Sequence, residues 1–297
     1  MNQTKEAQNT RLDLTAVVLT YNEEMNLEEC LNSLLPLNCR IVAVDSGSKD
    51  KTIDILKNFD VDIYHNEFHN YGDQRNWAQQ NTGINTEWVL HLDADERLTE
   101  KLRENVFNAL TNISDNELAG YLISRRTIFM GKFIKHGGHY PVYHNRIFRL
   151  SKGSCEVRLY DQHFIVDGTV KPLDGDIIDV TDDLKVWFER HMKWAEREAS
   201  QVLLKSRSSK LVQGKFTGTP IERRRWLKNN LYYKMPLFFR CLVYFVIRYF
   251  FRMGVLDGYR GFIFHFLHAF WYRFKVDIYI LKKRFIQYLK ERVVIYI

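Results

Sequence analysis

Apolar and polar positions alternate along the first hundred residues in a way that predicts strands and helices in turn. Four runs rich in β-branched and other apolar residues have the length of buried strands. These runs cover residues 12–20, 40–47, 61–68 and 87–95. The segments between them carry apolar residues at helical spacing, as at Leu27, Leu31 and Leu34. This order predicts an α/β fold in which helices flank a mostly parallel, Rossmann-like sheet.

The pattern changes after about residue 110. A strand-like run begins at Ala119, and short strands and loops continue to about residue 182. A long helix is predicted for residues 183–207, followed by a linker and then by aromatic, basic helices. The expected domains are residues 1–220, divided at about 12–110 and 111–182, and an α-helical C-terminal region, residues 221–297.

The net charge of +7 is distributed unevenly along the chain. Residues 221–297 contain 16 Lys and Arg against 4 Asp and Glu, whereas the preceding residues contain 27 against 32. The four cysteines form no CxxC pair, which favours reduced thiols over a zinc or disulfide framework. The first thirteen residues are polar and lack the apolar core of a signal peptide, so we expect the chain in the cytoplasm.

Polar clusters follow three of the predicted strands at the point where each strand ends. The carboxyl ends of parallel strands meet at one edge of a sheet, where such folds bind their ligands. The three clusters therefore predict one ligand-binding crevice at this edge. The clusters are Thr20-Tyr21-Asn22-Glu23, Asp45-Ser46-Gly47 and Asp93-Ala94-Asp95.

Asp93 and Asp95 are separated by one residue at the end of the fourth strand. Two carboxylates so close raise each other's pKa unless a cation screens them. Hard oxygen ligands suit Mg²⁺ or Mn²⁺, which proteins commonly bind together with phosphate groups. The alternative is a solvated loop that leads into the next helix, with Glu96 as a charge at the helix start.

The other polar positions also have structural alternatives. Asn22 and Glu23 could cap the following helix, and Asp45 could form an Asx turn. Arg75 could belong to an exposed ion pair. Trp77 reads as a core residue rather than a ligand.

Four stretches are highly specific in combination: AVVLTYNEEMNLEECLNSL, IVAVDSGSKDKTIDIL, GDQRNWA and WVLHLDADE. In this order and spacing they resemble the inverting GT-A glycosyltransferases of family 2, over about residues 12–110. The next stretch, SRRTIFMGKFIKHGGHYPVYHNRIFR, is similar to the branch that includes lipopolysaccharide core biosynthesis glycosyltransferases. The resemblance weakens after about Gly168. It implies a GT-A fold and transfer of a sugar from a nucleotide-sugar, expected to be UDP-linked, to a lipid-linked saccharide in lipopolysaccharide- or lipooligosaccharide-type biosynthesis.

The resemblance also implies roles at the strand ends. The loop after the first strand would hold the base and ribose, Asp45 would contact the nucleoside, and Arg75 would reach the nucleotide or diphosphate. Asp93 would contact ribose and metal, and Asp95 would hold Mg²⁺ or Mn²⁺ on the diphosphate. The residues implied in donor binding are Thr20, Tyr21, Asn22, Glu23, Asp45, Gly47, Arg75 and Asp93.

An inverting transfer needs a side chain that removes the proton from the acceptor hydroxyl. In the resembling branch a His-Glu pair usually stands at this place and the Glu is the base, whereas this sequence has Asp161-Gln162-His163. We predict Asp161 as the catalytic base, with Glu156 as the alternative. His163 could orient the base or contact phosphate or metal, and a strand-edge histidine is the equally weighted alternative.

The stretch KHGGHYP predicts a tight loop over the donor sugar or the acceptor, with His136 and His139 as candidate contacts. A zinc site formed by His136, His139 and His144 is less favoured, because Cys and carboxylate partners at ligand spacing are missing. Four arginines could attract an anionic acceptor or could simply be solvated. They are Arg125, Arg126, Arg146 and Arg149.

The C-terminal region is too often interrupted by charge to cross a membrane as one helix. A span needs roughly 20 apolar residues, whereas the longest charge-free stretch, 261–272, has 12. Basic helices rich in Phe, Tyr and Trp suit the surface of an anionic membrane, which predicts a peripheral enzyme on the cytoplasmic face of the inner membrane. Packing against the first domain or against a second copy, as a homo-oligomer, is the alternative.

Two other function classes remain open. A module that binds nucleic acid or another anionic surface would also combine basic and aromatic residues. No RNA-binding signature is present and the apolar content is high, so we expect no nucleic acid. A sugar nucleotidyltransferase would share a similar sheet, but its phosphate loop is glycine-rich and basic, whereas LTYNEEMN contains neither glycine nor a basic residue.

Overall fold

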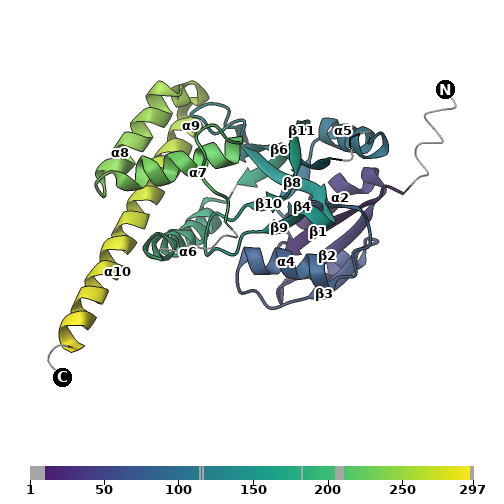
Figure 1. Ribbon diagram of the computed structural model, residues 1–297, viewed down its shortest axis with the longest axis horizontal. Helices are drawn as coiled ribbons and strands as arrows, with labels where there is room; N and C mark the ends of the chain where they lie inside the picture. Colours follow the sequence, from purple (N-terminus) through teal and green to yellow (C-terminus); the bar gives the residue numbers. More distant parts are fainter. Residues whose placement is uncertain (1–10, 114, 116, 182, 205–210, 295–297) are drawn as a thin grey trace. The chain divides into compact units, whose positions relative to one another are not determined.

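The structure, a computed structural model, describes residues 11–113, 115, 117–181, 183–204 and 211–294 (Figure 1). The polar segment 1–10 and the last three residues predicted for the long helix, 205–207, lie outside the described residues. The chain folds as two compact units. The first, the sheet unit, contains Met1–Arg126, Pro141–Val157 and Gln162–Val180. The second, the helical unit, contains Thr127–Tyr140, Arg158–Asp161 and Thr181–Ile297.

The sheet unit begins with the four predicted strands. They pair in parallel in the order β3-β2-β1-β4. Strands β1 to β4 span Leu14–Thr20, Arg40–Asp45, Asp62–His65 and Trp88–Asp93. Helices α2 to α5 span Leu27–Leu34, Thr52–Lys57, Tyr71–Asn81 and Glu100–Thr111. The predicted alternation of strands and helices is confirmed.

Antiparallel strands extend this sheet, so that the whole sheet is mixed (Figure 1). Strand β8 pairs antiparallel with β4, and β6 pairs antiparallel with both β8 and β7. Strand β11 pairs antiparallel with β5, and β9 and β10 form a separate antiparallel pair. These strands are β5 Glu96–Leu98, β6 Leu118–Phe129, β7 Lys132–Phe133, β8 Tyr143–Arg149, β9 Gly153–Cys155, β10 Phe164–Val166 and β11 Thr169–Thr181. Two short helical turns, η2 Leu35–Leu37 and η3 Leu150–Lys152, also lie in this unit. The predicted fold class, an α/β sheet flanked by helices with a helical C-terminal region, is confirmed, but the sheet is mixed and, in the described residues, only its first four strands pair in parallel.

The short strand β5 corrects one expectation. Glu96 does not start a helix but lies in β5 with 2% of its surface exposed. The following helix, α5, begins at Glu100 and is capped by the side chain of Thr99. Ala94, Glu96 and Leu98 are all buried, which is the period-two pattern of a strand. The carboxylate of Glu96 is therefore enclosed by protein.

Two apolar clusters cover the two faces of the parallel strands. Val18 and Leu90 belong to one cluster, together with residues of α2 and α5. Val17 and Val89 belong to the other, against which Trp77 of α4 packs. Successive residues of one strand face opposite sides of a sheet, so this division is the one expected of a doubly wound fold. Trp77 is a core residue, as predicted.

In its described residues the helical unit contains five helices with short helical turns between them. Figure 1 shows these helices. Helices α6 to α10 span Leu184–Leu203, Pro220–Asn230, Phe239–Val246, Gly258–His265 and Tyr272–Val294. The turns η4 to η7 span Tyr232–Lys234, Ile247–Phe251, Gly254–Asp257 and Phe266–Trp271. α10 packs on α6 through Tyr272 and Val276 against Ala195 and Ala199. None of the helices in the described ranges is both long and apolar enough to cross a lipid bilayer.

Two of the arginines that interrupt the C-terminal helices are buried. Arg240 is paired with Asp277, and neither side chain reaches solvent. Arg248 donates through Nε to the carbonyl oxygen of Gly137 at 2.8 Å. Their charges serve the packing of the helical unit, so these two arginines are no part of the basic surface that the composition predicts for membrane binding.

Candidate active site

The carboxyl ends of β1, β2 and β4 meet at one edge of the sheet. The register pairs Thr20 with Asp45 and Leu19 with Asp93, so the three polar clusters are neighbours. This is the edge at which parallel α/β sheets bind ligands.

Asn22 joins the loop after β1 to the loop after β2. Its φ of 55° lies in the left-handed region, which asparagine tolerates better than most residues. Its N–H donates to Ser48 Oγ (2.9 Å), and its Oδ1 accepts from the N–H of Lys49 (2.8 Å). Asn22 therefore does not cap α2, whose N-cap residue is Asn26.

Glu23 strengthens the same junction. Its N–H donates to Thr52 Oγ1 at 2.8 Å, and its carboxylate accepts from Asn26 Nδ2 at 2.9 Å. The side chain of Tyr21, one residue before the junction, is 57% exposed. The loop thus has a rigid frame and an aromatic ring open to solvent.

Asp45 is buried and shapes the turn at the end of β2. Its Oδ1 accepts from Thr20 Oγ1 (3.0 Å) and Ser48 Oγ (2.5 Å). Its Oδ2 accepts from the N–H groups of Gly47 (2.8 Å) and Ser48 (2.9 Å). Gly47 has a φ of 88°, which favours glycine. The Asx-turn reading of Asp45 is confirmed, and its contact to a nucleoside stays a prediction.

Helix α4, which carries the GDQRNWA stretch, is fastened to strand β9. A Cβ at Gly72 would stand 2.2 Å from the carbonyl oxygen of Glu156, so only glycine permits this approach. The side chain of Asn76 donates to the Cys155 carbonyl (2.9 Å) and accepts from the Cys155 N–H (2.7 Å). These contacts fix the position of Arg75 on the same helix.

Two arginines hold the first aspartate of the DAD sequence. Arg75 donates through one nitrogen to both carboxylate oxygens of Asp93, at 2.7 and 3.1 Å. Arg146 of β8 donates to Asp93 at 3.2 Å and to Glu96 at 2.7 Å. Both arginines are buried, so the reading of Arg75 as an exposed ion pair is wrong. Arg146 likewise belongs to this network and does not stand on the surface.

Burial and charge perturb the acids of this cluster in opposite directions. Burial acts to raise the pKa of Asp93, but Arg75 and Arg146 outweigh it and hold that pKa well below its usual range. Burial raises the pKa of Glu96 to about 7, and the neighbouring Asp93 and Asp95 add to the shift despite Arg146. Glu96 therefore keeps its proton to a higher pH than an exposed glutamate does, whereas Asp93 loses its proton at a lower pH than an exposed aspartate.

Two carboxylates of the cluster are of the ligand type that divalent metal ions prefer. Asp93 and Asp95 offer hard oxygens at a strand end, and both oxygens of Asp93 already accept hydrogen bonds from arginines. Metal binding at this edge stays a prediction. Within the described ranges no group of three or more His, Cys, Asp and Glu side chains is arranged to bind a metal. Asp93 and Asp95 could thus supply only part of a coordination sphere, as is usual where a phosphate supplies the rest.

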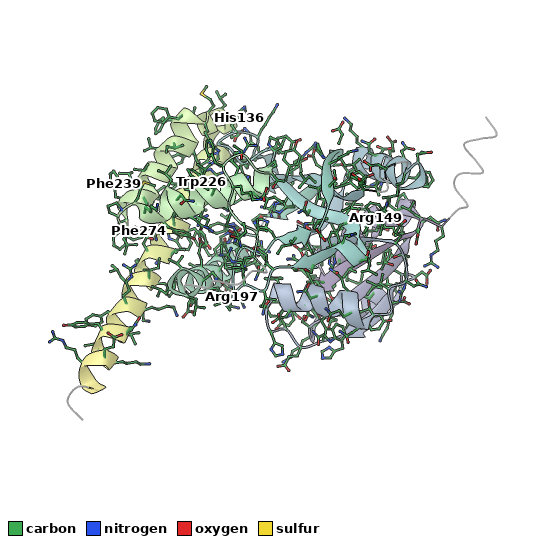
Figure 2. The ribbon with its side chains drawn as sticks, viewed as in Figure 1. His136, Arg149, Arg197, Trp226, Phe239 and Phe274 are labelled. Carbon is green, nitrogen blue, oxygen red and sulfur yellow. The ribbon has the colours of Figure 1, made fainter. Side chains whose placement is uncertain are left out.

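Three of the four arginines that were candidates for attracting an anionic acceptor also have structural partners in the sheet unit. Arg149 is paired in register with Trp88, at the start of β4, so it lies at the edge opposite Asp93 (Figure 2). Its Nε donates to the carbonyl of Leu118 at 2.8 Å, which corrects its assignment as an acceptor-attracting residue. Arg126 pairs with Asp176, whereas Arg125 lies 3.6 Å from Asp179.

The two candidate bases fall in different units of the chain. Glu156, in the sheet unit, is fully buried and accepts the N–H of His163 at 2.8 Å. Asp161, in the helical unit, has a φ of 61°, and its Oδ2 accepts from Lys228 Nζ at 3.1 Å. Its carbonyl oxygen accepts from Arg225 at 3.1 Å. The ring of His163 stacks on that of His144 within the sheet unit.

The two histidines of KHGGHYP lie in the helical unit. His136 is labelled in Figure 2. Its Nδ1 stands 2.7 Å from Asp257 Oδ1, and its backbone N–H donates to the other oxygen of that carboxylate at 3.0 Å. His139 is 8% exposed, with Nε2 2.9 Å from Thr127 Oγ1 and its ring against Phe264. This packing leaves His139 little exposed surface, and its contact to a sugar stays a prediction. His136 remains partly accessible.

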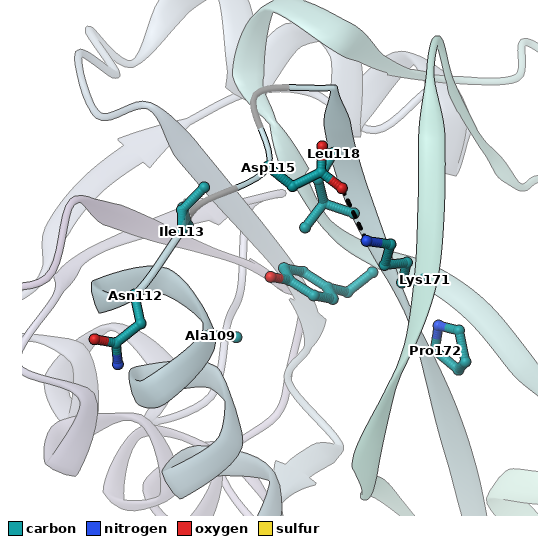
Figure 3. A pocket seen from close by; sticks show the side chains of 8 residues that line it. Ala109, Asn112, Ile113, Asp115, Leu118, Lys171 and Pro172 are labelled. Atoms are coloured by element: carbon teal, nitrogen blue, oxygen red, sulfur yellow. Dashed lines mark hydrogen bonds and ion pairs between the residues drawn. The ribbon is translucent and has the colours of Figure 1, made fainter.

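A separate pocket of about 260 Å³ lies at the start of β6 (Figure 3). It is lined by Leu118 and Tyr121, and Lys171 pairs there with Asp115 at 2.8 Å. β6 runs antiparallel to β8, which runs antiparallel to β4, so the start of β6 lies at the edge opposite the Asp93 cluster. The pocket is therefore no part of the candidate site.

Sequence reasoning missed Glu96 and Asn76 and misread Arg146. Ala94, Glu96 and Leu98 alternate in burial only in the folded chain, and the sequence itself shows no apolar alternation that would have revealed β5. No local pattern marks Asn76 or Arg146, because their partners are 79 and 50 residues away in the chain.

Comparison with known proteins gives the chain a family. The family model described as glycosyl transferase family 2 matches residues 15–169. The lipopolysaccharide core biosynthesis glycosyltransferase LpsC of Rhizobium meliloti is 30% identical over 126 residues, which cover 41% of this chain and 45% of LpsC. An uncharacterized glycosyltransferase of Rickettsia bellii is 26% identical over 110 residues, 37% of each chain. The chain thus matches less than half the length of these relatives.

Solved structures with similar folds include S. aureus TarS, residues 1–349. It is 15% identical, with a TM-score of 0.43 and coverage of 92% of this chain and 91% of that chain. Glucosyl-3-phosphoglycerate synthase from Mycobacterium tuberculosis, solved with Mn²⁺ and uridine-diphosphate-glucose, is 16% identical at a TM-score of 0.33. That match covers 42% of this chain and 47% of the synthase.

Proposed function

Because the chain belongs to glycosyl transferase family 2, we propose that it is a metal-dependent, inverting hexosyltransferase. It transfers a sugar from a nucleotide-sugar, UDP-linked, to a lipid-linked saccharide of a cell-envelope glycan of the lipopolysaccharide or lipooligosaccharide type. One observation carries the proposal: Asp93 is clamped between Arg75 and Arg146 at the same sheet edge as the loops tied together by Asn22 and Asp45. A structural loop would not need two buried arginines on one partly exposed carboxylate.

The residues of this edge prepare the donor site. Arg75 and Arg146 keep Asp93 ionised at neutral pH and fix its orientation. Glu96 accepts the N–H of Asp93 at 3.0 Å and so restrains the backbone of the turn. Asp93 and Asp95 would hold a divalent ion, which when bound neutralises charge on the leaving diphosphate. The exposed ring of Tyr21 supplies a surface for the nucleotide base.

Inversion follows from attack on the face of the sugar opposite the diphosphate. The acceptor oxygen bonds to the anomeric carbon, the bond from that carbon to the diphosphate oxygen breaks, and nucleoside diphosphate leaves with the electron pair. The hydroxyl proton passes to a carboxylate. We assign this base to Asp161, whose side chain is oriented by Lys228. Glu156 is the alternative.

The lipid-linked acceptor and the location are proposed on separate grounds. LpsC is named for lipopolysaccharide core biosynthesis, and the helical unit is basic and aromatic. A peripheral position on the cytoplasmic face of the inner membrane would bring such an enzyme to a lipid-anchored substrate.

Donor binding is the first expected result. UDP-sugars with Mn²⁺ should raise the melting temperature, because a ligand that binds only the folded state adds about 2.7 kcal/mol of stability at a hundredfold excess over its Kd. The measurement is a thermal-shift and hydrolysis screen of UDP- and GDP-sugars with and without Mn²⁺. Glu291→Gln, on the exposed end of α10, is the matched control and should respond as the wild type does. Absence of stabilisation or hydrolysis with every donor would reject the proposal.

The base assignment makes a second prediction. Asp161→Asn should lower the transfer rate by roughly 10² to 10⁴-fold while the thermal shift with donor and Mn²⁺ persists, because a general base acts on the acceptor. Glu156→Gln is the paired variant, measured in the same assays. If Asp161→Asn keeps full activity and Glu156→Gln loses it with donor binding intact, the base is Glu156.

A further inference from the structure

The turn that connects α8 to α9 exposes an unusual amount of apolar surface. Six of the ten residues 250–259 are large apolar or aromatic side chains that are exposed to solvent. We name this set the apolar turn. It consists of Phe250, Phe251, Met253, Val255, Leu256 and Tyr259. Phe251 is 78% exposed, and soluble surfaces rarely gather such residues without a partner.

The apolar turn is held in place by buried groups beneath it. Gly254 is so close to His265 that a Cβ would stand 2.7 Å from the ring, and Met253 adopts a φ of 60° just before it. Asp257 is buried and accepts the N–H of His136 at 3.0 Å. The backbone therefore reverses sharply around a fixed polar anchor. This rigid base projects the apolar side chains outward.

The exposed charges of the chain segment that carries the apolar turn are of one sign. Between Arg223 and Lys290 the sequence contains two acidic residues, Asp257 and Asp277, and both are buried. The exposed charges of this segment are therefore all basic, and Arg252 is exposed within the apolar turn itself. An apolar projection on a segment whose exposed charges are basic is complementary to an anionic lipid surface, with acyl chains beneath phosphate groups.

We propose that the apolar turn inserts into the interface of an anionic membrane and is the element that docks this chain on lipid. A second copy of the chain fits less well, because two such faces would bring basic surfaces together without an exposed acid in the segment to pair with them. The described helices do not span a bilayer, so insertion is confined to one leaflet.

Hydrogen bonds connect the segment of the apolar turn to the KHGGHYP loop. Gly137 donates its N–H to the carbonyl of Arg252 at 2.8 Å and accepts from Arg248 at 2.8 Å. Together with the Asp257–His136 contact, these bonds join the loop rigidly to the lipid-facing turn. The membrane would then set the position of the loop. This part of the inference rests on the proposed function, in which the loop contacts donor sugar or acceptor.

The test uses the full chain and vesicles of phosphatidylcholine with or without phosphatidylglycerol. The double variant Phe251→Glu, Leu256→Glu should reduce co-sedimentation with phosphatidylglycerol vesicles by at least about tenfold, because it places two carboxylates where acyl chains and phosphates would lie. The matched control is Leu281→Glu, Phe285→Glu, which makes the same change at exposed apolar positions on α10. The control should bind within about threefold of the wild type.

Three results would overturn the inference. The wild type could fail to bind vesicles, both double variants could lose vesicle binding equally, or only the α10 control could lose vesicle binding. Dissociation of a wild-type dimer by the variant at Phe251 and Leu256, without lipid binding, would assign the face to a second copy. If either double variant melts early, Met253→Cys carrying a polarity-sensitive dye replaces it, and an unshifted emission on vesicles rejects insertion.

Donor hydrolysis without vesicles separates this inference from the proposed function. The variant at Phe251 and Leu256 should hydrolyse the donor as the wild type does. If the wild type hydrolyses the donor but does not bind vesicles, only the docking proposal is wrong. If it binds vesicles but shows no donor activity, the transferase proposal is wrong and the docking proposal stands.

Discussion

Replacing Asp95 by asparagine is expected to lower sugar transfer by about three orders of magnitude, the effect of losing about 4 kcal/mol of charge stabilisation in the transition state. Asp95 follows β4 beside the clamped Asp93 and contributes to the raised pKa of Glu96. Asparagine keeps the shape of the side chain but removes the negative charge that a divalent ion needs. The rate should be measured with donor and acceptor over a range of Mn²⁺ concentrations.

The matched control for this change is Asp62→Asn. Asp62 starts β3, at the opposite edge of the same parallel sheet, and forms an exposed ion pair with Arg40 at 2.8 Å. Such pairs contribute little, so this variant should keep the wild-type rate. If Asp95→Asn retains more than about a tenth of the activity with an unchanged Mn²⁺ dependence, the metal role of Asp95 is wrong. Melting curves of both variants should match the wild type, which excludes unfolding as the cause.

Replacing Asp277 by alanine should give the largest loss of stability, about 3–5 kcal/mol, since it leaves a buried arginine without its counter-charge. Asp277 is 0% exposed and pairs with Arg240, which is 2% exposed. Its other oxygen accepts the N–H of Phe238 at 2.7 Å and the thiol of Cys241 at 3.2 Å. The melting temperature should fall by roughly 10 °C, followed by circular dichroism and tryptophan fluorescence.

Two further variants test the reason for that loss. Glu291→Ala removes an exposed carboxylate from the same helix and should change the free energy of unfolding by less than about 0.5 kcal/mol. Arg240→Met combined with Asp277→Ala should be more stable than Asp277→Ala alone, because the unpaired charge is gone. A double variant that is less stable than the single one would show that the charge is not the cause.

Local patterns in the sequence were sufficient to predict the scaffold of the site. Strand and helix periodicities are set by neighbouring residues, so the first four strands and the helices between them were predicted within a few residues. The polar clusters at Thr20, Asp45 and Asp93 were assigned to one edge for the same reason, because parallel strands carry their carboxyl ends together.

The expectations that failed concern residues whose environment comes from distant parts of the chain. Glu96 was assigned to a helix start, but pairing of β5 with β11 places it in a buried strand. Arg149 looked like Arg146 in the sequence, and the register of β8 on β4 separated them.

The sequence by itself determined the α/β order, the edge where polar groups gather and the basic, aromatic character of the C-terminal helices, because each of these depends on composition or on spacing along a short segment. Only the tertiary structure decided that Arg75 and Arg146 clamp Asp93, that Asp257 anchors His136 across 121 residues, and which apolar side chains of the helical unit remain exposed. Those features depend on strand register and helix packing, which bring together groups that no local pattern relates.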